Sequence, residues 1–399
     1  MKREALLDSS KRFSFVAATD SLHEAARQAV GYADFGAPVY LSGFRVLVDA
    51  YDREARFSQA GEEAVRHLLI HLLANRLRAQ RMWTENPAIL RTEIRRPLFI
   101  LGTVRSGTTV LHQLLSQDPA NQVVENWLAL RPRPRPPREL WEDDPDFQQA
   151  VRAGEAMARR DPALKAIHFV TADAADECFH LLQQNFTDHF FDQTAHVPSY
   201  SAWFDRTDMV PSYERHRDLL KLIGWTSPER RWLLKYPSHL AHLQALFAVY
   251  PDACIVHTHR DPCKVIPSIC SLLAHVRAFY EDPVDLAAVG RQNVDYWSTR
   301  LEAYLKTRRA YNPAQFFDLH FGEILSDPVG AAKRVYAYFH LEWTDDLDQR
   351  LRRWQADNPR DKHGEHVYRA EDFGLTDDAI AARFGRYMTH FNIERERSR

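Results

Sequence analysis

The chain has 399 residues, with 52 basic against 54 acidic side chains and a formal net charge of −2. This balance excludes a nucleic-acid-binding protein that depends on bulk positive charge, and 12% aromatic residues exclude wholesale disorder. No apolar run approaches the roughly 18 residues of a membrane span. Four cysteines form neither a disulfide framework nor a Cys-x-x-Cys metal site, and MKREALLDSSKRF contains no signal-peptide core, so we expect a cytoplasmic protein.

The beginning of the chain, residues 1–95, is predicted to be a helical region. Three segments carry apolar residues three and four positions apart, with good helix formers between them. They are LHEAARQAV, FRVLVDAYDREARF and EEAVRHLLIHLLANRLRAQRMW.

A different pattern fills residues 96–345, where short apolar runs alternate with helical patterns. The run LFILG at 98–102 is too short for a helix and lies between Pro97 and a glycine, which favours a buried strand. This alternation predicts an α/β fold, a three-layer parallel sheet with helices on both faces. A helical cap is predicted where segment 140–230 interrupts the alternation. Further strands are predicted at 122–124, 231–235, 253–259 and 315–321.

Two polar stretches receive plainer predictions. The basic, proline-rich RPRPRPP at 131–137, followed by the acidic EDDPD at 142–146, predicts an exposed connector in polyproline geometry, with a wall of the substrate entrance as the alternative. The last stretch, IERERSR at 393–399, predicts a frayed helix end.

The most informative stretch runs from Gly102 to Thr109, GTVRSGTT, between the first predicted strand and a helix start. Backbone N–H groups converge on an anion in such a turn, and the helix dipole adds about half a positive charge. The spacing equals that of a nucleotide-triphosphate loop, except that Thr108 replaces its lysine, which counts against ATP or GTP hydrolysis. Arg105 offers a planar cation inside the loop instead. We therefore predict an anion-binding loop on a sheet of the P-loop nucleotide-binding type.

A second constellation follows the predicted strand at 253–259. Arg260 falls at the carboxyl end of that strand, where open α/β sheets bind ligands, and Ser268 follows eight residues later on a helix. Pairing of Arg260 with Asp261 or another carboxylate, with Ser268 as a tolerated helix residue, is an equally good explanation of this pattern taken alone.

Together the two stretches resemble the sulfotransferases that use 3′-phosphoadenosine 5′-phosphosulfate (PAPS), in their broad bacterial branch. Blocks such as DECFHLL, RWLLKYPSHL and IVHTHRDP look similar to that branch, from about residue 30 to 390. The resemblance implies PAPS as donor, no required metal, and 5′-phosphosulfate binding by Arg105, Ser106, Gly107, Thr108 and Thr109. It also implies that Arg260 and Ser268 hold the 3′-phosphate.

The resemblance extends loosely to the C-terminal segment 346–399, which is expected to close the donor site. Other sulfotransferases cover the 3′-phosphate and adenine with a late basic loop that contains glycine. Lys362 and Gly364 match that loop here, although a solvated charge cluster explains them as well.

Sulfuryl transfer needs an acceptor in line with the sulfur, a base, and cations on the oxygens. Glu125 is the first candidate base, because it follows the predicted strand at 122–124 and some sulfotransferases have a glutamate after a similar Asp-Pro. Closer relatives place a tryptophan immediately before this glutamate, whereas here Trp127 follows Glu125 by two residues. This difference leaves His239 as the alternative base. The resemblance places Lys235 and His239 beside the donor, and Arg105 would share in catalysis.

Two further sets of side chains are explained without a catalytic role. Asp176 and Glu177 are expected to begin a helix, where carboxylates favour the dipole. His257 and His259 share one face of a strand, and without a third ligand we prefer packing or hydrogen bonding over a metal pair.

The sequence thus predicts a sulfotransferase that acts on a hydroxyl or amine of a small molecule, lipid or sugar. A kinase-like phosphoryl transferase would want the loop lysine and acidic magnesium ligands, and an inactive nucleotide-binding protein of the same fold is the second alternative. The acceptor is not identified by the sequence, and the oligomeric state stays open, with a homodimer as one option.

Overall fold

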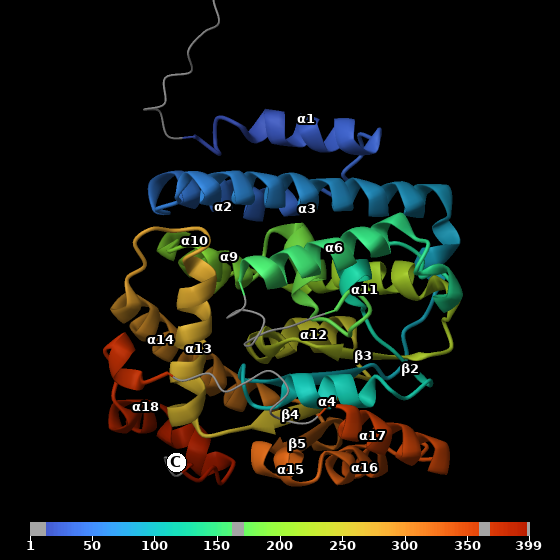
Figure 1. Ribbon diagram of the computed structural model, residues 1–399, viewed down its shortest axis with the longest axis vertical. Helices are drawn as coiled ribbons and strands as arrows, with labels where there is room; N and C mark the ends of the chain where they lie inside the picture. The colour runs from blue at the N-terminus through green and yellow to red at the C-terminus, as the bar shows by residue number, and fades with distance from the viewer. Residues whose placement is uncertain (1–12, 162–170, 359–367, 397–399) are drawn as a thin grey trace, which may run out of the picture.

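The computed structural model describes residues 13–161, 171–358 and 368–396, and the element labels are those of Figure 1. Five parallel strands form one sheet in the order β2-β3-β1-β4-β5. The strands are β1 (Leu98–Gly102), β2 (Asn121–Gln122), β3 (Arg231–Lys235), β4 (Cys254–His259) and β5 (Phe316–His320). The predicted α/β fold with a parallel sheet is therefore confirmed.

The central strand β1 shows how the sheet separates two apolar layers. Side chains alternate across a strand, so Phe99 and Leu101 join one buried cluster while Leu98 and Ile100 join the other. The smaller cluster is covered by helices from near the phosphate loop and from after β5. These are α4 (Thr108–Leu115), α15 (Phe321–Ser326), α16 (Pro328–Tyr338) and α17 (Asp345–Asp357).

The larger cluster extends from the other face of the sheet to the N-terminal helices, which lie farthest from the sheet in Figure 1. These are α1 (Thr19–Val30), α2 (Tyr40–Arg53) and α3 (Gln59–Glu85), each of which overlaps one predicted helical segment and begins a few residues before it. Because Phe44 of α2 and Phe99 of β1 belong to one cluster, the helical region shares its core with the sheet. The predicted domain boundaries stay a prediction.

The predicted cap lies between the N-terminal helices and the sheet (Figure 1). The helix α5 (Asn126–Leu130) leads into the cap. The cap's own described helices are α6 (Pro145–Arg160), α8 (Phe179–Leu182), α9 (Phe190–Thr194), α10 (Pro198–Phe204) and α11 (Val210–Ile223). The remaining helices pack beside β4 and at the C-terminal end. They are α12 (Leu243–Val249), α13 (Pro262–Arg277), α14 (Leu286–Arg308) and α18 (Asp377–His390).

Short 3₁₀ turns link several of these elements. They are η1 (Pro87–Arg91), η2 (Arg138–Leu140), η3 (Gln183–Asn185), η4 (Gly224–Thr226), η5 (Pro237–His242), η6 (Pro313–Gln315) and η7 (Ala370–Phe373).

The proline-rich strip at 131–137 is not the exposed connector that the sequence predicts. Arg131 and Arg133 form ion pairs with Asp146 and Asp144, which belong to the following acidic stretch. Arg135 is buried and bonds to Glu125. The opposite charges of the two stretches draw the strip onto the protein, because paired guanidinium groups can be buried where solitary ones cannot.

Two boundaries also differ from the prediction. The second strand comprises Asn121 and Gln122 rather than 122–124, since the chain beyond it bonds to the cap instead of β3. At the C-terminus, α18 ends at His390, so residues 393–396 are an irregular segment and not a frayed helix end.

Candidate active site

The predicted anion loop connects the end of β1 to the start of α4. Its backbone takes left-handed angles at Arg105 (φ 70°) and Gly107 (φ 90°), a conformation that suits glycine and strains other residues. Gly102 is required for a different reason: a Cβ atom there would lie 2.3 Å from Oγ1 of Thr258 on β4. The loop therefore curls tightly against the central strands and presents the first N–H groups of α4, which have no partner within a helix.

The hydroxyl of Ser106 fastens this loop. It donates to the carbonyl oxygen of Thr103 at 2.6 Å and lies 2.7 Å from Oγ1 of Thr258, and the residue is fully buried. In this arrangement the Ser106 side chain stabilises the conformation of the loop through these two contacts. Thr109, at the exposed helix start, turns its Oγ1 toward Lys235.

Lys235 is the last residue of β3 and pairs in register with Ile100 of β1. Its Nζ lies 3.4 Å from Oγ1 of Thr109 and forms an ion pair with the carboxylate of Glu177. The Lys235 side chain is only 3% exposed, so this cation is held at the loop and does not extend into solvent. A lysine, a carboxylate and the helix start thus meet at the carboxyl edge of the sheet.

Glu177 reaches this edge through backbone pairing. The segment 172–176 runs antiparallel to residues 124–127, with N–H groups of Asn126 and Asp176 bonded across at 2.9 and 2.8 Å. The N–H of Cys178 then donates to the carbonyl of Lys235 at 3.0 Å. The expected helix start at 176–177 is wrong, since α8 begins at Phe179. Because that pairing is remote in sequence, local pattern could not reveal it.

Arg260 occupies the carboxyl end of β4, as predicted, and contacts the loop directly. Its Nη1 donates to the carbonyl of Arg105 at 2.9 Å, and its guanidinium lies 4.0 Å from the ring centroid of Phe321. The fork of the guanidinium binds both oxygens of Glu396, at 2.8 and 3.0 Å. Ser268 is buried on α13. The arginine predicted to hold a phosphate therefore holds a carboxylate of the chain's own C-terminal segment.

The segment that carries Glu396 is itself anchored. The backbone N–H of Glu396 donates to Oδ2 of Asp261 at 2.7 Å, while Oδ1 of the same aspartate caps α13. Asp261, which the sequence offers as a partner for Arg260, thus accepts hydrogen bonds from two backbone N–H groups, one in the C-terminal segment and one at the start of α13. The predicted donor residues Lys362 and Gly364 lie outside the described residues.

The two candidate bases lie in different surroundings. The carboxylate of Glu125 receives bonds from Nε and Nη2 of Arg135, both at 3.1 Å, and is largely buried. His239 is completely buried on η5, with Nδ1 2.6 Å from the hydroxyl of Tyr213. Burial holds the pKa of His239 well below its ordinary value. Both assignments stay predictions.

The histidine pair on β4 acquires a third neighbour. Asp318 of β5 lies 3.0 Å from Nε2 of His259 and 3.9 Å from Nδ1 of His257, and the three ligand atoms fall within 4.8 Å of one another. Arg308 donates two bonds to the Asp318 carboxylate, at 2.6 and 2.7 Å. Since that guanidinium already balances the carboxylate, we assign the cluster no metal.

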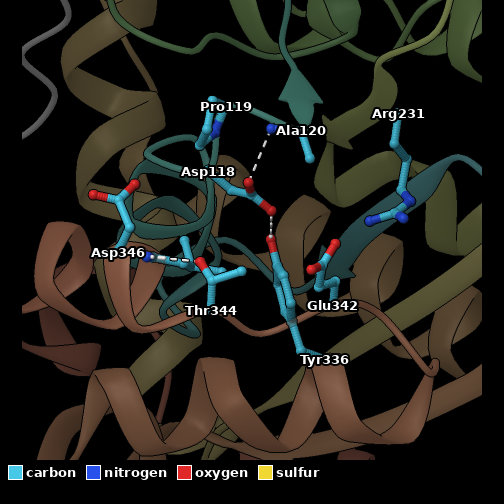
Figure 2. A pocket seen from close by; sticks show the side chains of 9 residues that line it. Asp118, Pro119, Ala120, Arg231, Tyr336, Glu342, Thr344 and Asp346 are labelled. Atoms are coloured by element: carbon cyan, nitrogen blue, oxygen red, sulfur yellow. Dashed lines mark hydrogen bonds between the residues drawn. The ribbon is translucent and has the colours of Figure 1, made fainter.

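The described residues line a larger and a smaller cavity that have no residue in common. The larger, about 300 Å³, opens beside Arg231 at the amino end of β3, where Tyr336 donates to Asp118 at 2.6 Å (Figure 2). That end is remote from the phosphate loop. The smaller, about 90 Å³, is bounded by α3, α5, α8, η3 and α9, and its wall includes Phe179, two residues from Glu177.

A comparison with known families decides the class of enzyme. The model of the sulfotransferase family matches residues 97–345, from β1 to the start of α17. The chain belongs to the sulfotransferase family. This match confirms the resemblance, sulfuryl transfer as the activity, and PAPS as the donor substrate.

Solved structures extend the similarity over nearly the whole sulfotransferase. STF1 from Mycobacterium tuberculosis H37Rv is 38% identical with a TM-score of 0.85, covering 93% of this chain and 99% of that one. STF9 from Mycobacterium avium is 27% identical with a TM-score of 0.88, covering 96% and 99%. A curated relative, the omega-hydroxy-beta-dihydromenaquinone-9 sulfotransferase Stf3 of Mycobacterium bovis, is 26% identical over 73% of this chain and 74% of its own length. None of the described helices is long and apolar enough to cross a membrane.

Proposed function

We propose that this sulfotransferase binds PAPS between the loop 102–109 and Arg260, and that Glu177 and Lys235 carry the transfer to an alcohol. The observation that supports this most directly is the contact of Lys235 Nζ with both Glu177 and Thr109. It brings a cation, a carboxylate and the start of α4 to one point. Sulfuryl transfer requires those three elements at the sulfur.

In the proposed step, the acceptor oxygen attacks the sulfur in line with the bridging oxygen of the donor. The new O–S bond forms as the bond between sulfur and that bridging oxygen breaks. The acceptor proton passes to the Glu177 carboxylate, and the departing 5′-phosphate takes the electron pair. Lys235 and Arg105 offset the negative charge that grows on the phosphate. Lys235 exchanges Glu177 for phosphate oxygens when the donor binds, which frees the carboxylate to act as base.

Position favours Glu177 over the two bases that the sequence suggests. A base must come within hydrogen-bond reach of the acceptor. Glu177 keeps 16% of its side chain exposed at the sheet edge, whereas His239 is enclosed by the rings of Phe99, Tyr213 and Tyr236. Glu125 is engaged by Arg135 and supports the strand that holds the 172–176 segment.

The acceptor is proposed to be an apolar small molecule or lipid with a hydroxyl group. The cap and the N-terminal helices beside the site contribute aromatic and aliphatic side chains, such as Phe179, Phe190 and Leu72. The curated relative Stf3, which is named for a hydroxylated menaquinone derivative, is consistent with this class.

Calorimetry with the desulfated donor, 3′-phosphoadenosine 5′-phosphate, tests the donor site without an acceptor. We expect binding without magnesium, and weak binding of ATP, because the loop has Thr108 where triphosphate loops have lysine. Tight ATP binding that depends on magnesium, with no response to the bisphosphate, would refute the proposed donor site. Transfer of labelled sulfate from PAPS to a panel of alcohols then tests the acceptor class.

A further inference from the structure

The small cavity beside the active site has the composition of a binding pocket. Six of its described lining residues are apolar, and none is Asp, Glu, Lys or Arg. Phe179 and Phe190 stack there with ring centroids 5.3 Å apart and planes 12° from parallel. Such a lining excludes a charged ligand and favours one whose burial removes apolar surface from water.

The position of the cavity ties it to catalysis. Its wall is α8, whose entry is fixed by the bond from Cys178 N–H to the Lys235 carbonyl. The Phe179 ring lies 5.9 Å from the ring of Tyr236, the residue after Lys235. One wall of the cavity is therefore two residues along the chain from Glu177 and close to the residue that follows Lys235.

One polar side chain in the wall lacks a partner. Gln183 is 2% exposed, and its amide Nε2 has no hydrogen-bond partner among the described residues. Nearby Asn75 is satisfied, since it donates to the Leu130 carbonyl at 2.7 Å, and His71 lies 2.8 Å from the same oxygen. Burial lowers the pKa of His71 to about 4, so this imidazole is neutral near pH 7. Buried N–H donors are nearly always paired in folded proteins. Gln183 lines the cavity while its Nε2 atom has no exposed surface, so a turn of the side-chain amide toward the cavity would let an oxygen of a ligand supply the missing partner.

We propose that this cavity is the specificity pocket for the acceptor, and that it takes a neutral ring or short branched chain bearing an oxygen that accepts from Gln183. The reacting hydroxyl lies at the other end of the same molecule, at Glu177. The proposal rests on the proposed function of the neighbouring site. It narrows the acceptor to an alcohol with an uncharged apolar body and a second oxygen.

Two probe alcohols of similar shape separate the two parts of the proposal. One is 4-methoxybenzyl alcohol, which carries an ether oxygen, and the other is 4-ethylbenzyl alcohol, which lacks it. Sulfate transfer from PAPS and ligand binding by calorimetry are measured for both in the wild-type enzyme. We expect the methoxy compound to bind about tenfold more tightly, the contribution of one net hydrogen bond.

Substitution of Gln183 by leucine keeps the volume and removes the donor. In Gln183→Leu the methoxy compound should lose its tenfold advantage while the ethyl compound binds as before. Ala129→Leu, which fills the cavity from α5, should abolish binding of both alcohols and leave 3′-phosphoadenosine 5′-phosphate binding intact. Should that variant fail to fold, the comparison of the two alcohols in Gln183→Leu still decides the question.

Distinct results identify which proposal fails. Equal loss of both alcohols in Gln183→Leu, or unchanged binding in folded Ala129→Leu, would overturn the pocket. If the enzyme binds the bisphosphate and sulfates glucose but neither benzyl alcohol, the donor site stands and the pocket is wrong. Absence of bisphosphate binding in the wild-type protein would overturn the donor site itself.

Discussion

The proposed donor edge and the proposed acceptor cavity of this sulfotransferase are built in contrasting ways. The donor edge uses two short stretches of sequence, 102–109 and 260–268, that the parallel sheet brings together through Arg260 and the Arg105 carbonyl. The cavity uses four helices, with lining residues spread from Leu68 to Phe190 and none of them acidic or basic apart from two histidines. Under the proposed function, donor binding depends on charge fixed by the fold, and acceptor choice depends on apolar side chains outside the sheet, which can change without disturbing the loop.

The largest effect is expected where the two regions meet, at Glu177. Glu177→Gln keeps the shape and removes the proton acceptor, so turnover should fall by roughly 10²–10⁴-fold. Affinity for 3′-phosphoadenosine 5′-phosphate, measured by calorimetry, should barely change. Glu125→Gln is the matched control and should retain most of the turnover. A collapse in the control with near-normal activity in Glu177→Gln would return the role to Glu125.

The donor edge alone is tested by Arg260→Ala. Loss of a charge-assisted contact to the 3′-phosphate should weaken bisphosphate binding by about 1.5–3 kcal/mol, roughly ten- to a hundredfold. Adenosine 5′-phosphosulfate, which lacks the 3′-phosphate, should bind the variant and the wild-type enzyme equally. Similar losses for both nucleotides would show that Arg260 supports the loop through the Arg105 carbonyl instead.

A smaller effect in the opposite direction is expected from Glu396→Gln. Glu396 and the 3′-phosphate compete for one guanidinium, and a partly exposed ion pair contributes about 0–1 kcal/mol. Bisphosphate affinity should therefore rise by up to about fivefold. Glu394→Gln, two residues earlier, serves as control and should have no effect. In an Arg260→Ala background the gain should vanish, and its persistence would contradict direct competition.

The smallest effect concerns stability near the acceptor side. Asp188 is buried and accepts a bond from Tyr236 at 2.9 Å, and burial raises its pKa to about 8. From about pH 4 to 8 the folded state keeps a proton that the unfolded chain releases, so stability should fall as the pH rises. Between pH 5 and pH 8 the melting temperature of the wild-type protein should fall by a few degrees more than that of Asp188→Asn. Parallel curves would exclude this titration.

The sequence predicted the loop and strand ends of the proposed donor edge far better than the helices around the cavity, for physical reasons. The phosphate loop and the strand ends are local patterns, because a short apolar run, glycines and a helix start lie within a dozen residues. Glu177 was assigned to a helix start because its partners, Lys235 and the 124–127 segment, are remote in the chain. The ion pair between Arg135 and Glu125 could not be predicted either, since it forms only when the proline-rich strip at 131–137 folds back onto the protein. The residues of the cavity come together only through packing of separate helices.

The pairing of Arg260 with Glu396 has a consequence for the end of the catalytic cycle. The product keeps the 3′-phosphate of the donor, so any contact that improves donor capture also delays product departure. If Arg260 holds the 3′-phosphate as proposed, a carboxylate held 2.8 Å from the arginine, on a segment anchored to Asp261, can replace the phosphate as the product leaves, so that the guanidinium exchanges one anion for another. The C-terminal segment would then accelerate product release and relieve product inhibition, at the cost of weaker donor binding.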